Sequence, residues 1–151
     1  MSIFSKLGFV GWEEIEPTML ACLVSCHPIL LVGYHGCNKT DGPGKIVKSL
    51  LGTSARYQKY DLQWLRTDDF LGYANPKSLM SGKVDHIPTD ISIWGADAVL
   101  FDEINRANPS IASKALELVR EKTVQGRDTG VKYVFASLNP PGKYRTSYLD
   151  E

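Results

Sequence analysis

Three polar segments of the sequence contain the residue types that bind phosphates and metal ions. They are Gly33–Thr40, Asp102-Glu103 and Asn139, and each directly follows an apolar run. The first segment matches the phosphate-loop pattern G-x-x-x-x-G-K-[ST], except that Asn38 stands at the second glycine. In such a loop, backbone N–H groups surround the phosphates and the lysine adds a mobile cation. For this segment alone, the alternative interpretation is a glycine-containing turn with a surface lysine.

The expected phosphate contacts cover this loop and the residue after it. Lys39 would neutralise phosphate charge, and the Thr40 hydroxyl would bind Mg²⁺. Such a loop needs a strand before it and a helix after it. The apolar run Ile29–Val32 precedes it, and a helix candidate follows that ends near Leu51, with Gly52 as its stop. We expect the nucleotide to contact Gly33, His35, Gly36, Cys37, Asn38, Lys39, Thr40 and Asp41.

Polar residues also follow two later apolar runs. Val99-Leu100-Phe101 leads into Asp102 and Glu103, about 60 residues after the loop, which is a Walker B arrangement. Asp102 would hold Mg²⁺ together with Thr40, and Glu103 would polarise the attacking water. Asn139 ends the last apolar run and would orient water beside the γ-phosphate. The alternatives are solvated acids at a strand end and an Asn-Pro turn.

The elements that must position these residues alternate along the chain. Continuous apolar runs predict strands, and apolar residues at helical spacing predict helices. Strands alternating with helices indicate an α/β fold with a parallel sheet, in which ligands bind beyond the carboxyl ends of the strands. The predicted strands are Ile29–Val32, Tyr57–Asp61, Ala98–Phe101 and Val131–Leu138, and the predicted helices include Trp12–Ser25 and one that begins at Asn108-Pro109.

Several expectations concern burial. The run Ile29–Val32 predicts a strand covered on both faces. Cys22 and Cys26 are expected to be small buried side chains. The three tryptophans, Trp12, Trp64 and Trp94, are expected to pack in the core rather than to stack on ligands. The helix after Asn108 is expected to bury Ile111, Ala112, Ala115, Leu116, Leu118 and Val119.

Composition limits the class of protein. The chain has 151 residues, 43% of them apolar and 23% charged, which predicts a single globular domain spanning residues 1–151. Seventeen basic residues balance seventeen acidic ones, so nothing favours a nucleic-acid partner. The longest apolar run, about 15 residues, is too short to cross a membrane. Three cysteines form no disulfide framework, and a cytoplasmic location is expected.

The string Asp102-Glu103-Ile104-Asn105-Arg106-Ala107, followed by an Asn-Pro helix start, resembles the Walker B signature of MoxR-type AAA+ ATPases. Three further segments are similar to that family. Gly8–Glu13 resembles its G-x-V-G-Q-E segment, Ala115–Gly126 its A-L-L-E stretch, and Phe135–Pro140 its sensor-1 strand, with Asn139 at the sensor position. The similarity extends over nearly the whole chain.

The resemblance implies a P-loop NTPase fold of the AAA+ type with ATP and Mg²⁺ as ligands. It implies ATP hydrolysis coupled to chaperone-like protein remodelling or metalloenzyme maturation. Glu103 would be the catalytic base and Asn139 the water-orienting sensor, with Thr40 and Asp102 serving Mg²⁺. The expected assembly is a homo-oligomeric ring, a hexamer, acting on a protein client or with a von Willebrand A domain partner.

The loop and the helix after it depart from that family. Asn38 is bulkier than glycine and narrows the approach of the backbone to phosphate. Gly42, Pro43 and Gly44 fall in the first turns of the predicted helix, where proline costs about 3 kcal/mol and glycine about 1. We therefore predict a helix that is distorted or shortened at its start, and weaker nucleotide binding than is usual in the family.

The sequence also stops at Glu151, where the family continues into a fifth core strand, an arginine finger and a helical lid. The expected chain is therefore a partial AAA+ core. It predicts slow hydrolysis or none in isolation, since an arginine finger contributes about 10³- to 10⁵-fold to the rate in other NTPases. The second interpretation is a degenerate or truncated module that binds partners, and nucleotide in some cases, without turnover.

Two other features bear on function. Arg106 follows the two acids, and the resemblance implies an interface or coupling role, the alternative being a local salt bridge. Residues Ser78–Trp94 predict a hairpin insert that faces the ring pore in this clade, the alternative being an ordinary surface excursion. A DNA-restriction or helicase motor is a third interpretation, which the balanced charge does not favour.

Overall fold

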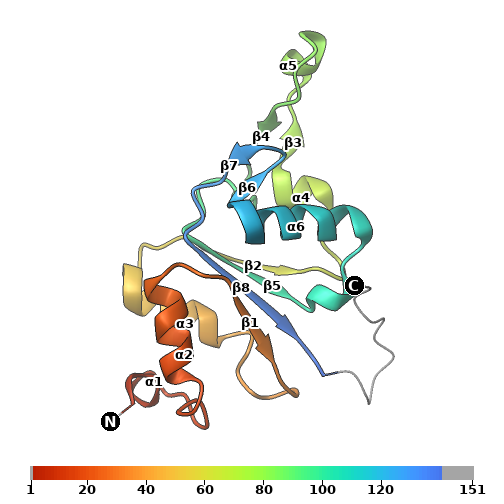
Figure 1. Ribbon diagram of the computed structural model, residues 1–151. Coiled ribbons are helices and arrows are strands. Elements are labelled where there is room, and N and C mark those ends of the chain that lie inside the picture. Colours follow the sequence, from red (N-terminus) through yellow and green to blue (C-terminus); the bar gives the residue numbers. More distant parts are fainter. Residues whose placement is uncertain (1, 141–151) are drawn as a thin grey trace.

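A four-stranded parallel sheet organises residues 2–140, the part of the chain that the computed structural model describes (Figure 1). The strands lie in the order β1 (Ile29–Val32), β8 (Tyr133–Leu138), β5 (Ala98–Asp102) and β2 (Tyr57–Asp61). Every neighbouring pair is parallel. The predicted α/β fold and all four predicted strands are therefore confirmed, although the last one begins at Tyr133 rather than Val131.

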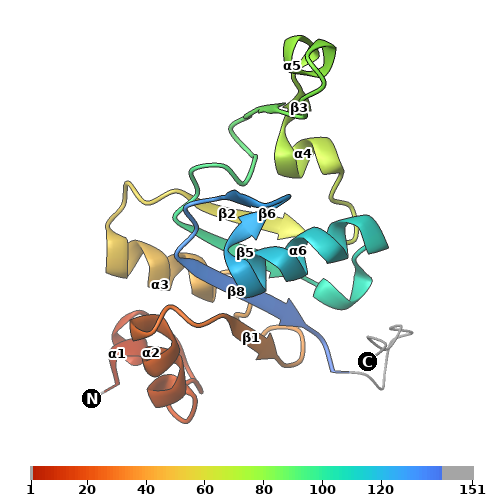
Figure 2. The same ribbon diagram turned by 45° about the horizontal axis from the view of Figure 1, so that its top comes forward.

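Helices cover both faces of this sheet, in two layers that Figures 1 and 2 separate clearly. The short α1 (Ile3–Lys6), α2 (Glu16–Val24) and α3 (Gly42–Leu51) pack on one face, and α4 (Thr67–Leu71) and α6 (Pro109–Glu121) pack on the other. Side chains alternate along a strand, so β5 supplies both cores. Ala98 and Leu100 face α2 and α3, whereas Val99 and Phe101 face α4 and α6.

The edge strand β1 corrects one prediction. Ile29 and Leu31 are buried against the α2 and α3 layer, but Leu30 and Val32 are 54% and 58% exposed. A continuous apolar run therefore does not lie covered on both faces here. The reason is position, because the core on the α6 side includes residues of β8 and β5 but none of β1.

Helix α6 begins where the sequence predicts. The Asn108 side chain accepts a hydrogen bond from the Ile111 N–H at 3.0 Å, and Pro109 takes the first helical position. Ile111, Ala115 and Leu118 are buried at the spacing of a single helical stripe. Leu116 is 53% exposed, so its predicted burial is wrong; it lies about 100° around the helix from Ala115.

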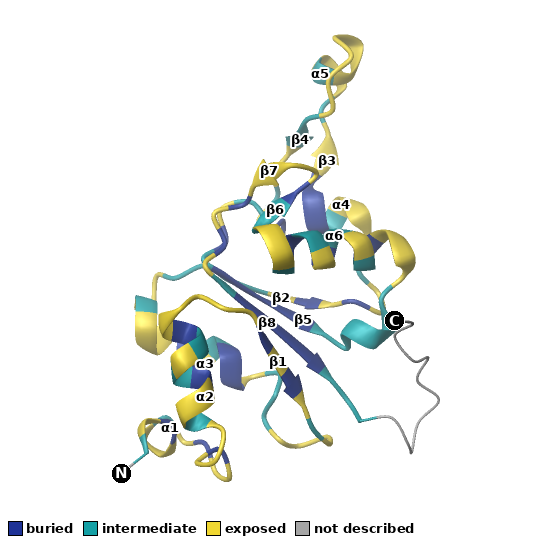
Figure 3. Cartoon of the chain, in the orientation of Figure 1, coloured by how far each residue is buried: buried dark blue, intermediate teal, exposed yellow. Residues whose placement is uncertain are grey.

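A narrow excursion extends from the body of the molecule, with its exposed residues prominent in Figure 3. It consists of β3 (Tyr73–Ala74), α5 (Pro76–Met80) and β4 (His86–Ile87), with β3 and β4 paired antiparallel. A hairpin is thus present, although it starts before Ser78. A second small hairpin joins β6 (Thr123–Val124) to β7 (Arg127–Asp128), and a 3₁₀ turn, η1, covers Ile104–Arg106. None of the helices within residues 2–140 has the length and apolar character needed to cross a bilayer.

The tryptophan and cysteine expectations hold only in part. Trp12 is buried, and Trp94 is partly buried with its indole N–H donating to the Leu71 carbonyl at 2.7 Å. Trp64 is 72% exposed, so its predicted packing in the core is wrong. Cys22 is partly buried, but Cys26 lies beyond the end of α2 at Val24 and is exposed, so its predicted burial is wrong.

Helix α3 begins at Gly42 rather than at Lys39, which confirms the predicted shortening. Pro43 lies in the first turn, where its missing N–H costs no helical hydrogen bond. Gly42 and Gly44 leave room for neighbouring aromatic rings. A Cβ built on Gly42 would lie 2.8 Å from Cη2 of Trp12, and one on Gly44 would lie 3.0 Å from Cε1 of Tyr57. Aromatic rings therefore lie against the start of the helix where a side chain would otherwise stand.

Gly42→Ala is expected to destabilise the protein, although alanine favours helix formation. The clash with Trp12 costs about 1–3 kcal/mol, as overpacking does elsewhere, which exceeds the propensity gain of at most about 1 kcal/mol. Urea denaturation followed by tryptophan fluorescence measures the difference. Ser49→Ala, on the exposed side of α3, is the matched control and should stay within about 0.5 kcal/mol of the wild type. A Gly42→Ala protein more stable than the wild type would contradict this packing role.

Candidate functional site

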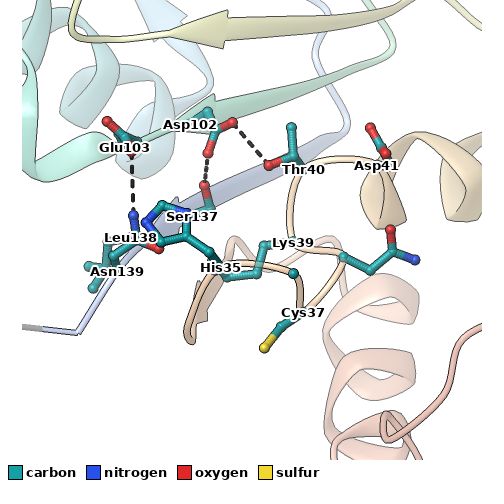
Figure 4. Close-up of a pocket in the computed structure, with 12 residues that line it drawn as sticks. His35, Cys37, Lys39, Thr40, Asp41, Asp102, Glu103, Ser137, Leu138 and Asn139 are labelled. Atoms are coloured by element: carbon teal, nitrogen blue, oxygen red, sulfur yellow. Dashed lines mark hydrogen bonds between the residues drawn. The ribbon is translucent and has the colours of Figure 1, made fainter.

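A pocket of about 360 Å³ opens at the carboxyl ends of β1, β5 and β8, where parallel sheets place their ligands (Figure 4). Ten of the eleven residues predicted for the site line it. Gly33 is the exception and lies at the base of the loop. Ser137 and Leu138 line it as well, and the sequence had not indicated them. The lining residues are His35, Gly36, Cys37, Asn38, Lys39, Thr40, Asp41, Asp102, Glu103, Ser137, Leu138 and Asn139.

The loop between β1 and α3 turns through two left-handed residues. Gly36 has φ +84° and Asn38 has φ +61°. Asparagine is one of the few residues other than glycine that adopts this conformation readily. Asn38 therefore meets the backbone requirement that the phosphate-loop pattern fills with glycine. The Trp12 indole N–H donates to the Cys37 carbonyl at 3.2 Å and joins the loop to the segment between α1 and α2.

Backbone donors gather where the loop enters α3. The Gly42 N–H donates to the Asn38 carbonyl at 2.9 Å, which closes a helical turn just before the helix. Within residues 2–140, the N–H groups of Asn38, Lys39 and Thr40 donate no hydrogen bond. Successive unpaired N–H groups in a loop that leads into a helix are suited to binding an anion. The shortened start of α3 therefore leaves donors beside Lys39 and Thr40.

The Lys39 ammonium is folded back onto its own loop. Its Nζ donates to the carbonyls of Gly33 and Tyr34, both at 2.6 Å. These contacts hold the loop closed at its base. Because the same ammonium would contact a phosphate, phosphate binding must replace two short hydrogen bonds. This competition is one physical reason to expect weak nucleotide binding.

The Asp102 carboxylate joins the loop to β8. Its Oδ2 accepts a hydrogen bond from the Thr40 hydroxyl at 3.1 Å, and its Oδ1 accepts one from the buried Ser137 hydroxyl. Lys59 Nζ lies 3.9 Å from Oδ2. Sequence reasoning missed Ser137. The available signal was a hydroxyl inside an apolar strand, where it needs a hydrogen-bond partner.

The Thr40 and Asp102 oxygens fit a magnesium site. Mg²⁺ takes oxygen ligands and is usually held by one or two protein groups together with waters and substrate phosphates. The 3.1 Å contact places the hydroxyl and the carboxylate side by side at the mouth of the loop.

Glu103 adopts a left-handed conformation at the end of β5, with φ +53°. This turn projects its carboxylate into the pocket beside Asn139, as Figure 4 shows. The Asn139 amide donates to Glu103 Oε1 at 3.3 Å. Glu103 Oε2 forms an ion pair with Arg106 at 2.7 Å, so the local salt bridge considered for Arg106 is present. A carboxylate and an amide thus meet where a water could be held.

Burial and the acids of the pocket also change the pKa of Tyr57. Burial raises the pKa of the Tyr57 phenol well above its usual range, and the negative charges of Asp102 and Asp41 raise it further. Its hydroxyl has no hydrogen-bond partner within residues 2–140. The phenol therefore stays neutral, and its ring serves mainly to pack against Gly44.

No protein-family model matches the sequence, and the comparison with curated proteins finds no significant match. Solved structures do resemble it. A protein from Cytophaga hutchinsonii, named a "putative ATPase", has a TM-score of 0.62 and 23% identity over 97% of this chain and 45% of that chain. The α/β fold of this chain, a parallel sheet flanked by helices, is therefore shared with that protein. At this identity the likeness shows the fold alone, and the chain spans less than half of that protein's length.

A second solved structure is the Saccharomyces cerevisiae Hsp104–ADP complex. It has a TM-score of 0.48 and 17% identity, and the match covers 83% of this chain and 19% of that chain. The likeness is too distant to inform the site.

The left-handed turn at Asn38 gives a direct test. Asn38→Gly should keep or slightly raise stability, whereas Asn38→Val should lower it by about 1–2 kcal/mol, because a branched side chain is strained at φ +61°. Denaturation midpoints of the two variants measure the difference. Equal midpoints for glycine and valine would contradict the conformation described.

Proposed function

We propose that the pocket binds ATP with Mg²⁺ and that the chain is the nucleotide-binding core of an AAA+ ATPase of the MoxR type. The observation that supports this most is the convergence of the loop 35–41 with Asp102, Glu103 and Asn139 in one pocket. Loop, acids and amide come from three separate segments of the sequence. Their meeting at the carboxyl edge of a parallel sheet is the arrangement that phosphoryl transfer needs.

In this proposal the loop N–H groups and Lys39 hold the phosphates, and the Thr40 and Asp102 oxygens hold the metal. Bound Mg²⁺ would neutralise charge on the β- and γ-phosphate oxygens. Glu103 accepts a proton from the water that attacks the γ-phosphate, and Asn139, 3.3 Å from Glu103, orients that water. Ser137 fixes the Asp102 carboxylate through its buried hydroxyl.

The wider role rests on the resemblance carried by Asp102–Ala107. We propose a cytoplasmic protein that works in a homo-oligomeric ring, a hexamer, and remodels protein clients or matures metalloenzymes. A von Willebrand A domain protein is the proposed partner. The hairpin that carries α5 would face the pore of such a ring and contact the client.

The second candidate is a binding module without turnover. One observation favours it: the Glu103 carboxylate is engaged on both oxygens, by Asn139 and by Arg106. A base occupied in this way does not accept a proton from water until a contact breaks. ATP binding without phosphate release would support this second candidate.

Thr40→Val tests the metal assignment. Valine has nearly the same shape as threonine but no hydroxyl. In the variant, ATP binding should lose most of its dependence on Mg²⁺, and ATP affinity measured with Mg²⁺ present should fall about tenfold. Titrations with and without EDTA measure this. Thr123→Val, at β6, removes a hydroxyl that bonds Glu117 and should leave Mg²⁺ dependence unchanged. Full Mg²⁺ dependence in Thr40→Val would overturn the assignment.

A further inference from the structure

Trp12 lies behind the loop between β1 and α3, on the side away from the proposed nucleotide pocket. Its indole lines a second hollow of about 520 Å³, next to β1 and α2, whereas Asn38 lines the nucleotide pocket. Cys37 and Lys39 line both hollows, so the loop lies between them. Trp12 is buried, and its ring stacks on Phe9 with the ring centroids 4.7 Å apart. An effect of Trp12 on bound phosphate would therefore pass through the loop.

Two hydrogen bonds hold the peptide groups on either side of Asn38. The Cys37 carbonyl accepts one from the Trp12 indole N–H at 3.2 Å. The Asn38 carbonyl accepts the other from the Gly42 N–H at 2.9 Å. In a planar trans peptide the carbonyl and the N–H point in opposite directions. The indole bond therefore directs the Asn38 N–H away from Trp12, and the helical turn directs the Lys39 N–H in the same manner.

The Asn38 N–H is a donor that an anion could use. Within residues 2–140 it donates no hydrogen bond, and Asn38 lines the pocket. Its present direction requires the left-handed backbone of Asn38, with φ +61°. This conformation is less favourable for a residue with a side chain than for glycine. A hydrogen bond that favours it raises the fraction of molecules in which the donor is already placed, and such preorganisation strengthens binding.

We propose that Trp12 is a positioning residue for phosphate binding, because its indole N–H holds the Cys37 carbonyl and thereby keeps the Asn38 N–H directed into the pocket. The inference rests on the proposed function, since the donor matters only if the pocket binds phosphate groups. The ring of Trp12 has a separate role. A Cβ on Gly42 would lie 2.8 Å from Cη2 of this ring, so the ring packs at the start of α3 while the N–H contacts the loop.

Two variants of the full chain separate the N–H from the ring. Trp12→Phe removes the donor and part of the ring. A second variant carries benzothienylalanine in place of Trp12, which keeps the shape of the indole but has sulfur where the N–H stands. Both should bind inorganic tripolyphosphate with Mg²⁺ about tenfold more weakly than the wild type, the loss expected for one charge-assisted hydrogen bond. ATP should lose affinity by the same factor.

Trp94→Phe is the matched control. Its indole N–H also donates to a backbone carbonyl, that of Leu71 at 2.7 Å, but on the other side of the sheet from Trp12. It should bind tripolyphosphate and ATP as the wild type does. Displacement of a fluorescent ATP analogue by each ligand measures the affinities, and circular dichroism of the same samples shows that they are folded.

Equal losses for tripolyphosphate and ATP in both Trp12 variants support the inference. Wild-type affinity for tripolyphosphate in the benzothienylalanine variant overturns it, and so does a loss confined to ATP, which would indicate direct contact with the nucleoside. If the wild type binds neither ligand, the proposed function fails as well. If the wild type binds both and the variants bind equally well, only the role of Trp12 fails. The benzothienylalanine variant keeps the test decisive if Trp12→Phe does not fold.

Discussion

Glu103→Gln is expected to abolish ATP turnover and leave ATP binding in place. Glutamine has the shape of glutamate and can still contact Asn139, but its amide cannot accept a proton from water. General bases contribute about 10²- to 10⁴-fold to such rates, so phosphate release should fall to background. Steady-state phosphate release and equilibrium binding of ATP, measured on the same preparation, separate the two effects.

Glu121→Gln is the matched control, because Glu121 is exposed at the end of α6, away from the pocket. It should hydrolyse ATP at the wild-type rate. Turnover in Glu103→Gln equal to that of the wild type would remove Glu103 from the mechanism. A wild-type chain that binds ATP without releasing phosphate would instead favour the module without turnover.

Lys39→Ala is expected to weaken ATP binding by about 10- to 100-fold, the loss that follows removal of a charge-assisted hydrogen bond to phosphate. Alanine also removes the hydrogen bonds from Lys39 to the carbonyls of Gly33 and Tyr34, which hold the loop closed at its base. Competition of ATP with a fluorescent analogue measures affinity. The thermal midpoint of the same sample shows whether the fold is retained.

Lys48→Ala controls for the loss of a lysine. Lys48 is exposed in the last turn of α3, on the same element but far along it from the loop. Its ATP affinity should equal that of the wild type. If Lys39→Ala and Lys48→Ala bind ATP equally, the loop is a turn with a surface lysine, which is the alternative its sequence leaves open.

Much of the fold could be predicted because the apolar runs of the sequence coincide with the strands of the sheet. Ala98–Phe101 is apolar throughout and is buried on both faces at the centre of the sheet. Ile29–Val32 looks the same in sequence, yet Leu30 and Val32 are exposed. Edge and central strands cannot be separated by local pattern alone, because the difference depends on which helices cross each strand.

The candidate site was predictable to the level of its segments, but the contacts within it were not. Local chemistry at Gly42-Pro43-Gly44 correctly indicated a shortened helix. It did not indicate that Trp12 and Tyr57 require those glycines. Likewise Asn38 differs in residue type from the glycine of the phosphate-loop pattern, but it adopts the left-handed backbone conformation that this glycine would adopt. Such contacts join residues far apart in sequence, so spacing carries no signal for them.

The most direct test of a nucleotide site in this pocket is a titration of the folded wild-type chain with a fluorescent ATP analogue and Mg²⁺, followed by displacement with unlabelled ATP. We predict saturable binding that ATP reverses and that weakens when EDTA removes the metal. Absence of saturable binding at several hundred micromolar analogue, in a chain shown by circular dichroism to be folded, would contradict a working phosphate loop.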